Sequence, residues 1–264
     1  MSNPHLPADI YDLIVDHLYD TQDVLRNCCL VSKSWVPRTR KYLFSTIVFS
    51  TVESLQSWKE TFPDPSTSPA TYTKDLLIDC PRVATAGSWI RDFSCVERLG
   101  VGAHALDFDF NESPTPLVRF HGFSPVLKPL RITVFALPSS QIFNLILSFS
   151  PLEDLVVVTH HQMSADNGDG SEEEEMSAVT QPSGSPRLTG SLHLYLSGGM
   201  EPLTRRLSSL PGGIHFRKLI LTWLEEKDPL MTTALVEGCS HILESLDIAC
   251  RLHGTSVQHL RPHR

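Results

Sequence analysis

A short apolar pattern recurs through most of this 264-residue chain and restricts the folds open to it. In each copy an apolar residue is followed three positions later by leucine and five positions later by an aliphatic residue. Clear copies begin at Val96, Leu127, Leu152, Phe216 and Leu243, and weaker copies begin at Thr73 and Thr189. Because side chains alternate between the two faces of a strand, the leucine and the aliphatic residue lie on one face. Each copy therefore predicts a short β-strand with an apolar side.

The copies are spaced regularly enough to predict repeated units. Their middle leucines lie roughly 23 to 31 residues apart, except for one longer step from Leu155 to Leu192. These leucines are Leu76, Leu99, Leu130, Leu155, Leu192, Leu219 and Leu246. Residues 46–49 are expected to form an opening strand, and helix-compatible stretches between copies include 52–62, 139–149 and 229–239. One strand and one helix per unit would make an α/β solenoid with a parallel sheet along its inner face.

The spacing resembles that of leucine-rich repeats, whose period is about 20–29 residues. One feature of those repeats is mostly missing, namely the asparagine that usually follows the second leucine. The residues near its place are Ala103, His104, Phe135, Thr159 and His160. Without an asparagine ladder the turns after the strands must be built in another way. The alternative is an irregular α/β domain whose strands recur by chance.

The longer step contains an acidic insertion at about residues 163–187. This segment holds acids, glycine, serine and proline but almost no large apolar residue, a composition that predicts disorder. It is expected to be a solvated surface loop. Ser171 directly precedes the acidic run 172–175, which suits acid-directed kinases, so regulation by phosphorylation is a second hypothesis.

Residues 6–44 follow a different pattern, which predicts three short helices. Pro7 suits the first turn of the first helix. That helix carries an apolar stripe at helical spacing, formed by Ile10, Leu13, Ile14 and Leu18. Thr21 and Ser34 are expected to cap the second and third helices, and Pro37 is acceptable only in the first turn of the third. About 40 residues are at the lower limit for an independent core, so the surplus apolar surface predicts a docking site.

This segment resembles the F-box. The F-box pattern is Leu-Pro-x-acid-Ile, then spaced aliphatic residues, a Val-x-Lys-x-Trp signature and a final Leu-aromatic pair. The matching residues here are Leu6-Pro7-Ala8-Asp9-Ile10, Ile14, Leu18, Val31-Ser32-Lys33-Ser34-Trp35 and Leu43-Phe44. Cys29-Leu30-Val31 and Asp23-Val24 depart from the usual residues but keep their polarity. An F-box, then a strand, then degenerate repeats is an architecture that resembles many fungal F-box proteins.

The resemblance implies a role in ubiquitin conjugation. F-box proteins bind a Skp-type adaptor, which joins them to a cullin scaffold and to the RING subunit of an SCF ubiquitin ligase. By position, the adaptor-binding or fold-defining residues would be Leu6, Pro7, Ile10, Ile14, Leu18, Val31, Trp35 and Leu43. Trp35 could instead hold the three helices together, and the sequence leaves both roles open.

Composition and motifs argue against several other classes of protein. The net charge of −8 argues against a generic nucleic-acid surface. No apolar run approaches the ~20 residues that span a bilayer, and the start lacks a signal-peptide pattern, so we expect a cytoplasmic or nuclear location. The six cysteines include no C-x-x-C pair, and the histidines form no compact ligand set. With no hydrolase, Walker or dinucleotide motif either, we expect no catalysis, no cofactor and no metal.

Together the patterns predict an α/β protein with a three-helix F-box at residues 1–45 and an irregular leucine-rich-repeat-like solenoid at residues 46–264. The expected function is substrate recognition in an SCF-type ubiquitin ligase, with the repeat domain binding an unidentified protein target. A non-ligase, repeat-based binding scaffold is the alternative. Side chains flanking the repeat leucines are candidates for recognition, namely Arg98, Arg131, Glu153, Asp154, Arg217, Lys218, Glu244 and Asp247.

Overall fold

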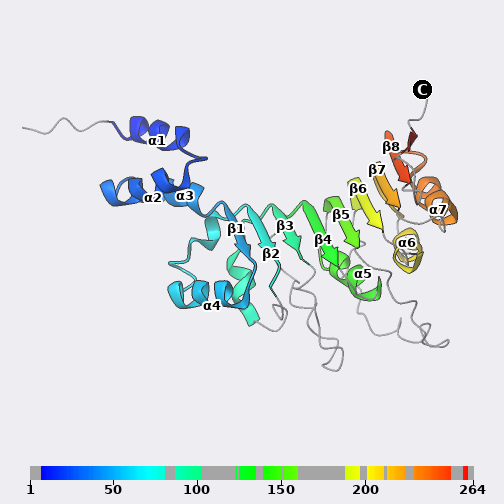
Figure 1. Cartoon of the computed structure of the whole chain (residues 1–264), viewed down its shortest axis with the longest axis horizontal. Coiled ribbons are helices and arrows are strands. Elements are labelled where there is room, and N and C mark those ends of the chain that lie inside the picture. The colour runs from blue at the N-terminus through cyan, green and yellow to red at the C-terminus, as the bar shows by residue number, and fades with distance from the viewer. Residues whose placement is uncertain are drawn as a thin grey trace, which may run out of the picture.

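The computed structural model describes residues 7–80, 87–102, 123, 125–134, 139–149, 152–159, 188–196, 201–210, 213–223, 229–250 and 258–260. In this part of the chain, three helices precede one long sheet that has further helices along it (Figure 1). The predicted acidic insertion lies outside the described residues, and so do residues 103, 104, 135 and 160 near the expected asparagine positions.

The helices and strands follow the order that the sequence predicts. The first helices are α1 (Ala8–His17), α2 (Gln22–Val31) and α3 (Val36–Leu43). The strands are β1 (Thr46–Phe49), β2 (Asp75–Ile78), β3 (Arg98–Val101), β4 (Pro129–Val134), β5 (Leu152–Thr159), β6 (Leu188–Leu196), β7 (His215–Trp223), β8 (Ser245–Cys250) and β9 (Gln258–Leu260). The other helices are α4 (Val52–Thr61), η1 (Pro69–Tyr72), η3 (Gly87–Asp92), α5 (Ser139–Leu147), α6 (Glu201–Ser208) and α7 (Pro229–Cys239). The predicted opening strand and the helices expected near 52–62, 139–149 and 229–239 are confirmed.

The strands of the described residues form one open sheet whose spatial order, β1 to β9, is the order of the strands along the chain. Strands β1 to β8 are parallel to their neighbours. Only β9 differs, because it runs antiparallel to β8. Parallel neighbours require a crossover between them. The prediction of a mixed α/β fold with a parallel sheet is therefore confirmed.

The repeat leucines lie directly opposite one another across the sheet. The register aligns Ile47, Leu76, Leu99, Leu130, Leu155, Leu192, Leu219 and Leu246 in a single row. A second row holds Phe49, Ile78, Val101, Ile132, Val157, Leu194, Leu221 and Ile248. Only the residues of β8 in these rows are half-buried, and the others are buried. The long step from Leu155 to Leu192 keeps this alignment, so the insertion leaves the stacking of the units intact.

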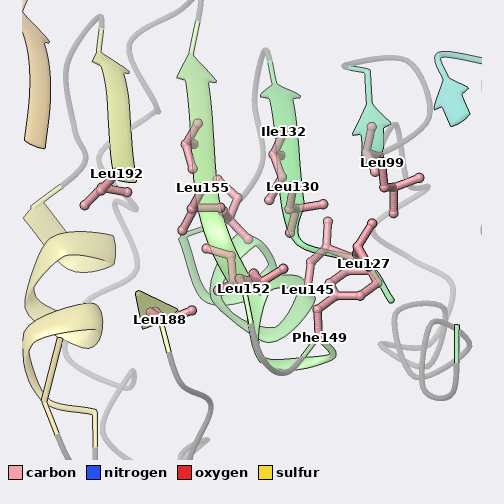
Figure 2. Close-up of a cluster of buried hydrophobic side chains, with 14 of the residues drawn as sticks. Leu99, Leu127, Leu130, Ile132, Leu145, Phe149, Leu152, Leu155, Leu188 and Leu192 are labelled. Carbon is pink, nitrogen blue, oxygen red and sulfur yellow. The ribbon is translucent and has the colours of Figure 1, made fainter. Parts of the chain in front are cut away.

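The helices beside the strands cover the apolar side of the sheet. Figure 1 shows α4, α5, α6 and α7 on the same side of the sheet. Leu145 of α5, Leu203 of α6 and Leu235 of α7 are completely buried within the same apolar cluster as the leucine row. Figure 2 shows Leu145 and Phe149 close to Leu127 and Leu152, at the base of the strands. The core is therefore one continuous layer between the sheet and its helices, as stacked units require.

Charged side chains pair along the edge where the strands begin. Lys74 pairs with Glu97 at 2.6 Å and Lys128 with Glu153 at 2.8 Å, each pair joining residues that directly precede neighbouring strands or begin them. Arg217 and Glu244 pair in the same way between β7 and β8, at 3.3 Å. The backbone follows the same course, since the N–H of Glu153 donates to the carbonyl of Lys128 at 3.0 Å. These exposed pairs each contribute little to stability, but they favour the observed register.

Gly190 allows β6 to join the sheet despite an irregular start. The pairing of β6 with β5 and with β7 shifts register near this residue. Gly190 has a φ of 79°, and a Cβ placed there would lie 1.9 Å from the carbonyl oxygen of Glu153. Gly213 has a similar φ of 76°, but a Cβ there would meet nothing within 4 Å. The two glycines therefore share a backbone conformation but differ in their surroundings.

Replacing Gly190 with alanine should destabilise the protein more than the same change at Gly213. Both variants add the strain of a left-handed residue, about 1–2 kcal/mol. Only Gly190→Ala also forces a side chain against neighbouring backbone. Denaturant titration of both variants measures the two losses in free energy of unfolding. Equal losses would contradict the role assigned to Gly190.

Candidate protein-binding surface

The three N-terminal helices begin in ways that partly match the sequence predictions. Pro7 is the residue before α1, with φ −57° and ψ 145°, and so lies just outside the first turn expected for it. Thr21 precedes α2, but its side chain bonds to Asp20 instead of capping the helix. The prediction that Ser34 caps the third helix is wrong, because α3 begins after Trp35, and the Ser34 hydroxyl bonds to that of Ser32 at 2.8 Å. Pro37 lies in the first turn of α3, as predicted.

Three of the four residues in the apolar stripe are exposed, whereas Leu18, directly after α1, is half-buried. Ile10 and Ile14 are each 39% exposed, and Leu13 is 54% exposed. Val15, which sits beside the stripe, is buried instead, with 1% exposure. In α1 one small apolar residue therefore faces inward, and larger apolar residues are exposed. An ordinary amphipathic surface helix buries its larger apolar residues instead.

A polar network joins α1 to α3. Arg38 donates from Nε to Oδ1 of Asp16 at 2.7 Å and from a terminal nitrogen to Oδ2 at 2.5 Å. The hydroxyl of Tyr42 donates to Oδ1 of the same carboxylate at 2.7 Å. These bonds, first from Arg38 and then from Tyr42, lower the pKa of Asp16 from an ordinary 3.8 to about 2. Asp16 therefore stays ionised whenever the protein is folded near neutral pH.

Two aromatic contacts accompany this network. Trp35 lies beside Tyr11 of α1, with ring centroids 5.5 Å apart, and Tyr42 lies 6.5 Å from Tyr19. Trp35 is half-buried, so it helps to hold the helices together while part of its surface stays open. Of the two roles that the sequence leaves open for Trp35, the contact with α1 is the one that the structure describes.

Helix α2 closes the small core between the helices. Leu25 is completely buried and Cys28 is 6% exposed. The Sγ atom of Cys29 lies 2.9 Å from the hydroxyl of Thr39 in α3, and Thr39 itself is buried. Val15, Leu25 and Cys28 are buried outside the large apolar cluster of the sheet. The domain boundary predicted at residue 45 stays a prediction.

Exposed apolar residues are concentrated on these helices. Residues 7–44 make up only about a fifth of the described chain. They supply seven of its twelve exposed large apolar residues, namely Ile10, Leu13, Ile14, Tyr19, Val24, Leu30 and Val31. Leu30 is the most open, with 86% exposure. Such a concentration is typical of a surface that another protein covers.

The predicted adaptor-binding residues fall into three groups. Pro7, Ile10, Ile14 and Val31 are exposed, and Leu18, Trp35 and Leu43 are half-buried. Leu6 lies outside the described residues. Reasoning from the motif missed Leu13, Tyr19, Val24 and Leu30 as exposed members of the surface. Only Leu13 had a signal in the sequence, because it belongs to the apolar stripe.

Phe44 connects the three-helix segment to the sheet. Its ring lies 6.0 Å from that of Trp58 and 6.1 Å from that of Phe62, both edge-on. Trp58 in turn contacts Phe49 of β1, with centroids 5.8 Å apart. The aromatic residue that ends the motif therefore packs against the first unit of the sheet.

The charged candidates on the sheet are mostly engaged with neighbours. Glu153, Arg217 and Glu244 belong to the ion pairs at the strand starts. Arg98 pairs with Asp75, and Asp154 accepts a hydrogen bond from Ser191 at 2.5 Å. Arg131, Lys218 and Asp247 are exposed on the side of the sheet opposite the apolar rows. The described charges on these strands are therefore of both signs and largely paired with one another, and they single out no particular site.

The described residues contain no group of three or more histidine, cysteine or acidic side chains that could hold a metal ion. The histidines at 160 and 161 and those of the C-terminal 253–263 stretch lie outside the described residues, apart from the backbone of His259. Burial raises the pKa of the Cys80 and Cys239 thiols, which lowers their reactivity. Among the described helices, none has the length and apolar character needed to cross a bilayer.

Comparison with known proteins finds no match to this chain among family models, curated proteins or solved structures. The resemblance of residues 6–44 to the F-box therefore rests on the residue motif.

Truncating Val15 should destabilise the protein much more than truncating Leu13. Val15→Ala removes buried methyl groups and is expected to destabilise the helical segment by about 2 kcal/mol. Leu13→Ala changes an exposed side chain and should cost no more than about 0.5 kcal/mol in the isolated protein. Amide hydrogen exchange in α1 and α3 measures both effects. A larger loss for Leu13→Ala would mean that the stripe faces inward.

The Asp16 network should also give a defined pH dependence. Because the folded protein lowers the pKa of Asp16, its contribution to stability is present above the ordinary value of 3.8 and is lost as the pH falls toward about 2. The difference in melting temperature between wild type and Asp16→Asn should stay constant from about pH 7 to about pH 5 and shrink below about pH 4. A difference that persists unchanged at about pH 2 would contradict this assignment.

Proposed function

We propose that this chain is the substrate-recognition subunit of an SCF-type ubiquitin ligase. The observation that carries the proposal is the exposed apolar surface of α1 and α2, which lies within the segment that resembles the F-box. A three-helix unit that turns Ile10, Leu13 and Ile14 outward needs a partner to cover them. In F-box proteins that partner is a Skp-type adaptor, bound in turn to a cullin scaffold.

The sheet that follows is proposed to be a degenerate leucine-rich-repeat solenoid. Three features support this, namely one leucine-centred strand per unit, parallel strands in chain order, and helices along one side. The missing asparagine pattern and the antiparallel β9 are departures from regular repeats. In a solenoid of this kind each unit contacts only its neighbours, so the open face can vary freely to suit a target.

In the proposed mechanism the chain supplies proximity and no chemistry of its own. The helices hold the adaptor, and the sheet holds a target protein within reach of the ubiquitin carrier recruited by the ligase. Such positioning raises the effective concentration of the reacting groups. Aromatic contacts of Phe44 with Trp58 and Phe62 would transmit the position of the helices to the sheet. This activity belongs in the cytoplasm or nucleus.

The test is binding of the full chain to the Skp-type adaptor of its source organism. Ile14→Asp places a charge in the proposed interface and should weaken adaptor binding at least ~30-fold, since losing a central apolar contact costs about 2 kcal/mol or more. Ile14 is exposed, so the variant should fold. The matched control is Val52→Asp on α4, because Val52 is 46% exposed but lies outside the helical surface.

The outcomes separate the two functions considered for the chain. A one-to-one complex that is lost in Ile14→Asp and kept in Val52→Asp supports the ligase role. A folded wild-type chain that fails to bind the adaptor overturns that role and leaves a repeat-based binding scaffold. Equal loss in both variants would mean that the adaptor contacts a surface other than the predicted one.

A further inference from the structure

We infer that Asp16 is a positioning residue for partner recognition. Its carboxylate fixes α1 against α3 and thereby holds the exposed row of Ile10, Leu13 and Ile14 in a defined orientation. The inference deepens the proposed function and rests on it for the binding readout, whereas the attachment of α1 can be tested without any partner.

Helix α1 has little apolar attachment of its own. Among the described side chains of α1, Val15 alone is buried. Burying one valine contributes only about 1.5–3 kcal/mol, less than the ordering of a helix of this length costs. Other contacts must therefore help to hold the helix in place, and the described ones include the ring contact of Tyr11 with Trp35 and the bonds of Asp16.

The carboxylate of Asp16 is held in a restricted geometry. Both oxygens of Asp16 accept from the guanidinium of Arg38, and Oδ1 also accepts from the Tyr42 hydroxyl. Two parallel N–H···O bonds restrict orientation as well as distance, because the guanidinium and carboxylate must be coplanar. Arg38 and Tyr42 are four residues apart and so share one face of α3. One side chain of α1 is thus held at two successive turns of its neighbour.

The end of α3 is in turn bonded to the start of the sheet. The carbonyl of Tyr42 accepts from the Ser45 hydroxyl at 2.8 Å. The carbonyl of Ser45 accepts from the backbone N–H of Asp75, at the start of β2, at 2.9 Å. These bonds link the end of α3 to the start of β2, so a helix α1 that is fixed to α3 is also placed relative to the first strands.

Other charged groups near the network are few. Lys41 of α3 acts on Asp16, and Asp12 of α1 acts on Arg38, both through space. The Nζ atom of Lys41 lies 5.9 Å from the Tyr42 ring centroid. Neither group replaces the direct bonds, so removing the Asp16 charge should release α1 without creating a new attachment.

The experiment compares Asp16→Asn and Tyr42→Phe with the control Asp23→Asn. Asp23 also pairs with an arginine, Arg26, but within α2 and with a side chain that is 90% exposed. Two readouts are needed, namely hydrogen exchange of the α1 amides in the free full-length chain and affinity for the Skp-type adaptor. Asp16→Asn should raise α1 exchange and weaken binding ~10-fold, Tyr42→Phe should do so ~3-fold, and Asp23→Asn should change neither.

A double variant tests whether Asp16 acts through the apolar row. If Asp16 does act through the row, the Asp16→Asn substitution should weaken binding less in the Ile14→Asp variant than in the wild-type chain. The reason is that Ile14→Asp has already disrupted the row. Full additivity would indicate an independent structural effect. The exchange of the sheet amides should stay as in wild type throughout, since a general loss of folding would also lower binding.

The outcomes distinguish this inference from the proposed function. Unchanged α1 exchange in Asp16→Asn overturns the inference whatever the adaptor does. Increased α1 exchange with unchanged affinity also overturns it, because the orientation of α1 would then be irrelevant to binding. If the wild-type chain does not bind the adaptor at all, the proposed function fails, and with it the recognition role, while the exchange result still decides whether Asp16 fixes α1.

Discussion

Leucine side chains packed in register across parallel strands are the interaction on which the rest of this molecule depends. Each repeat leucine lies opposite the leucine of the strand before and after it, from Leu76 through to Leu246. A single strand and helix could not bury such residues alone, because its apolar side would face water. Stacking many units converts a weak local pattern into one continuous core. The ends of the sheet and the N-terminal helices are arranged around this stack of strands.

The two ends of the sheet differ in what lies against their terminal strands. At the first end of the described sheet β1 pairs with β2, and the chain before it folds into α3 and packs Phe44 onto Trp58. At the other end β9 turns back and runs antiparallel to β8. An unpaired strand edge can recruit another chain. In the described part of the chain the reversed strand covers the edge of β8, the last of the parallel strands.

The three N-terminal helices reverse the usual distribution of polarity. Apolar residues such as Ile14 and Leu30 face outward, while Asp16, a charged residue, points toward the neighbouring helix. A unit this small has little room for an independent core, so several of its apolar residues stay exposed. Polar contacts with strict geometry, from Arg38 and Tyr42 to Asp16, hold α1 against α3.

The sequence by itself determined the features that depend on local periodicity. The repeat leucines could be identified as facing residues, and helices near 52–62 and 139–149 could be placed, because alternation and helical spacing are properties of neighbouring residues. Pro37 could be assigned to a first turn because its ring fixes φ. The α/β class and the parallel sheet followed from the repetition of these units.

Only the tertiary structure decided the features that depend on residues far apart in the chain. Asp16 meets Arg38 and Tyr42 across 22 and 26 residues, and nothing in the local pattern of an acidic residue predicts such partners. The same holds for Ser34. Its residue type predicts that it caps the third helix, but α3 begins after Trp35, so Ser34 does not cap it. Gly190 likewise meets the carbonyl of Glu153 from the neighbouring strand. Local spacing fixes which residues share a face, whereas packing between elements decides which face is covered and by what.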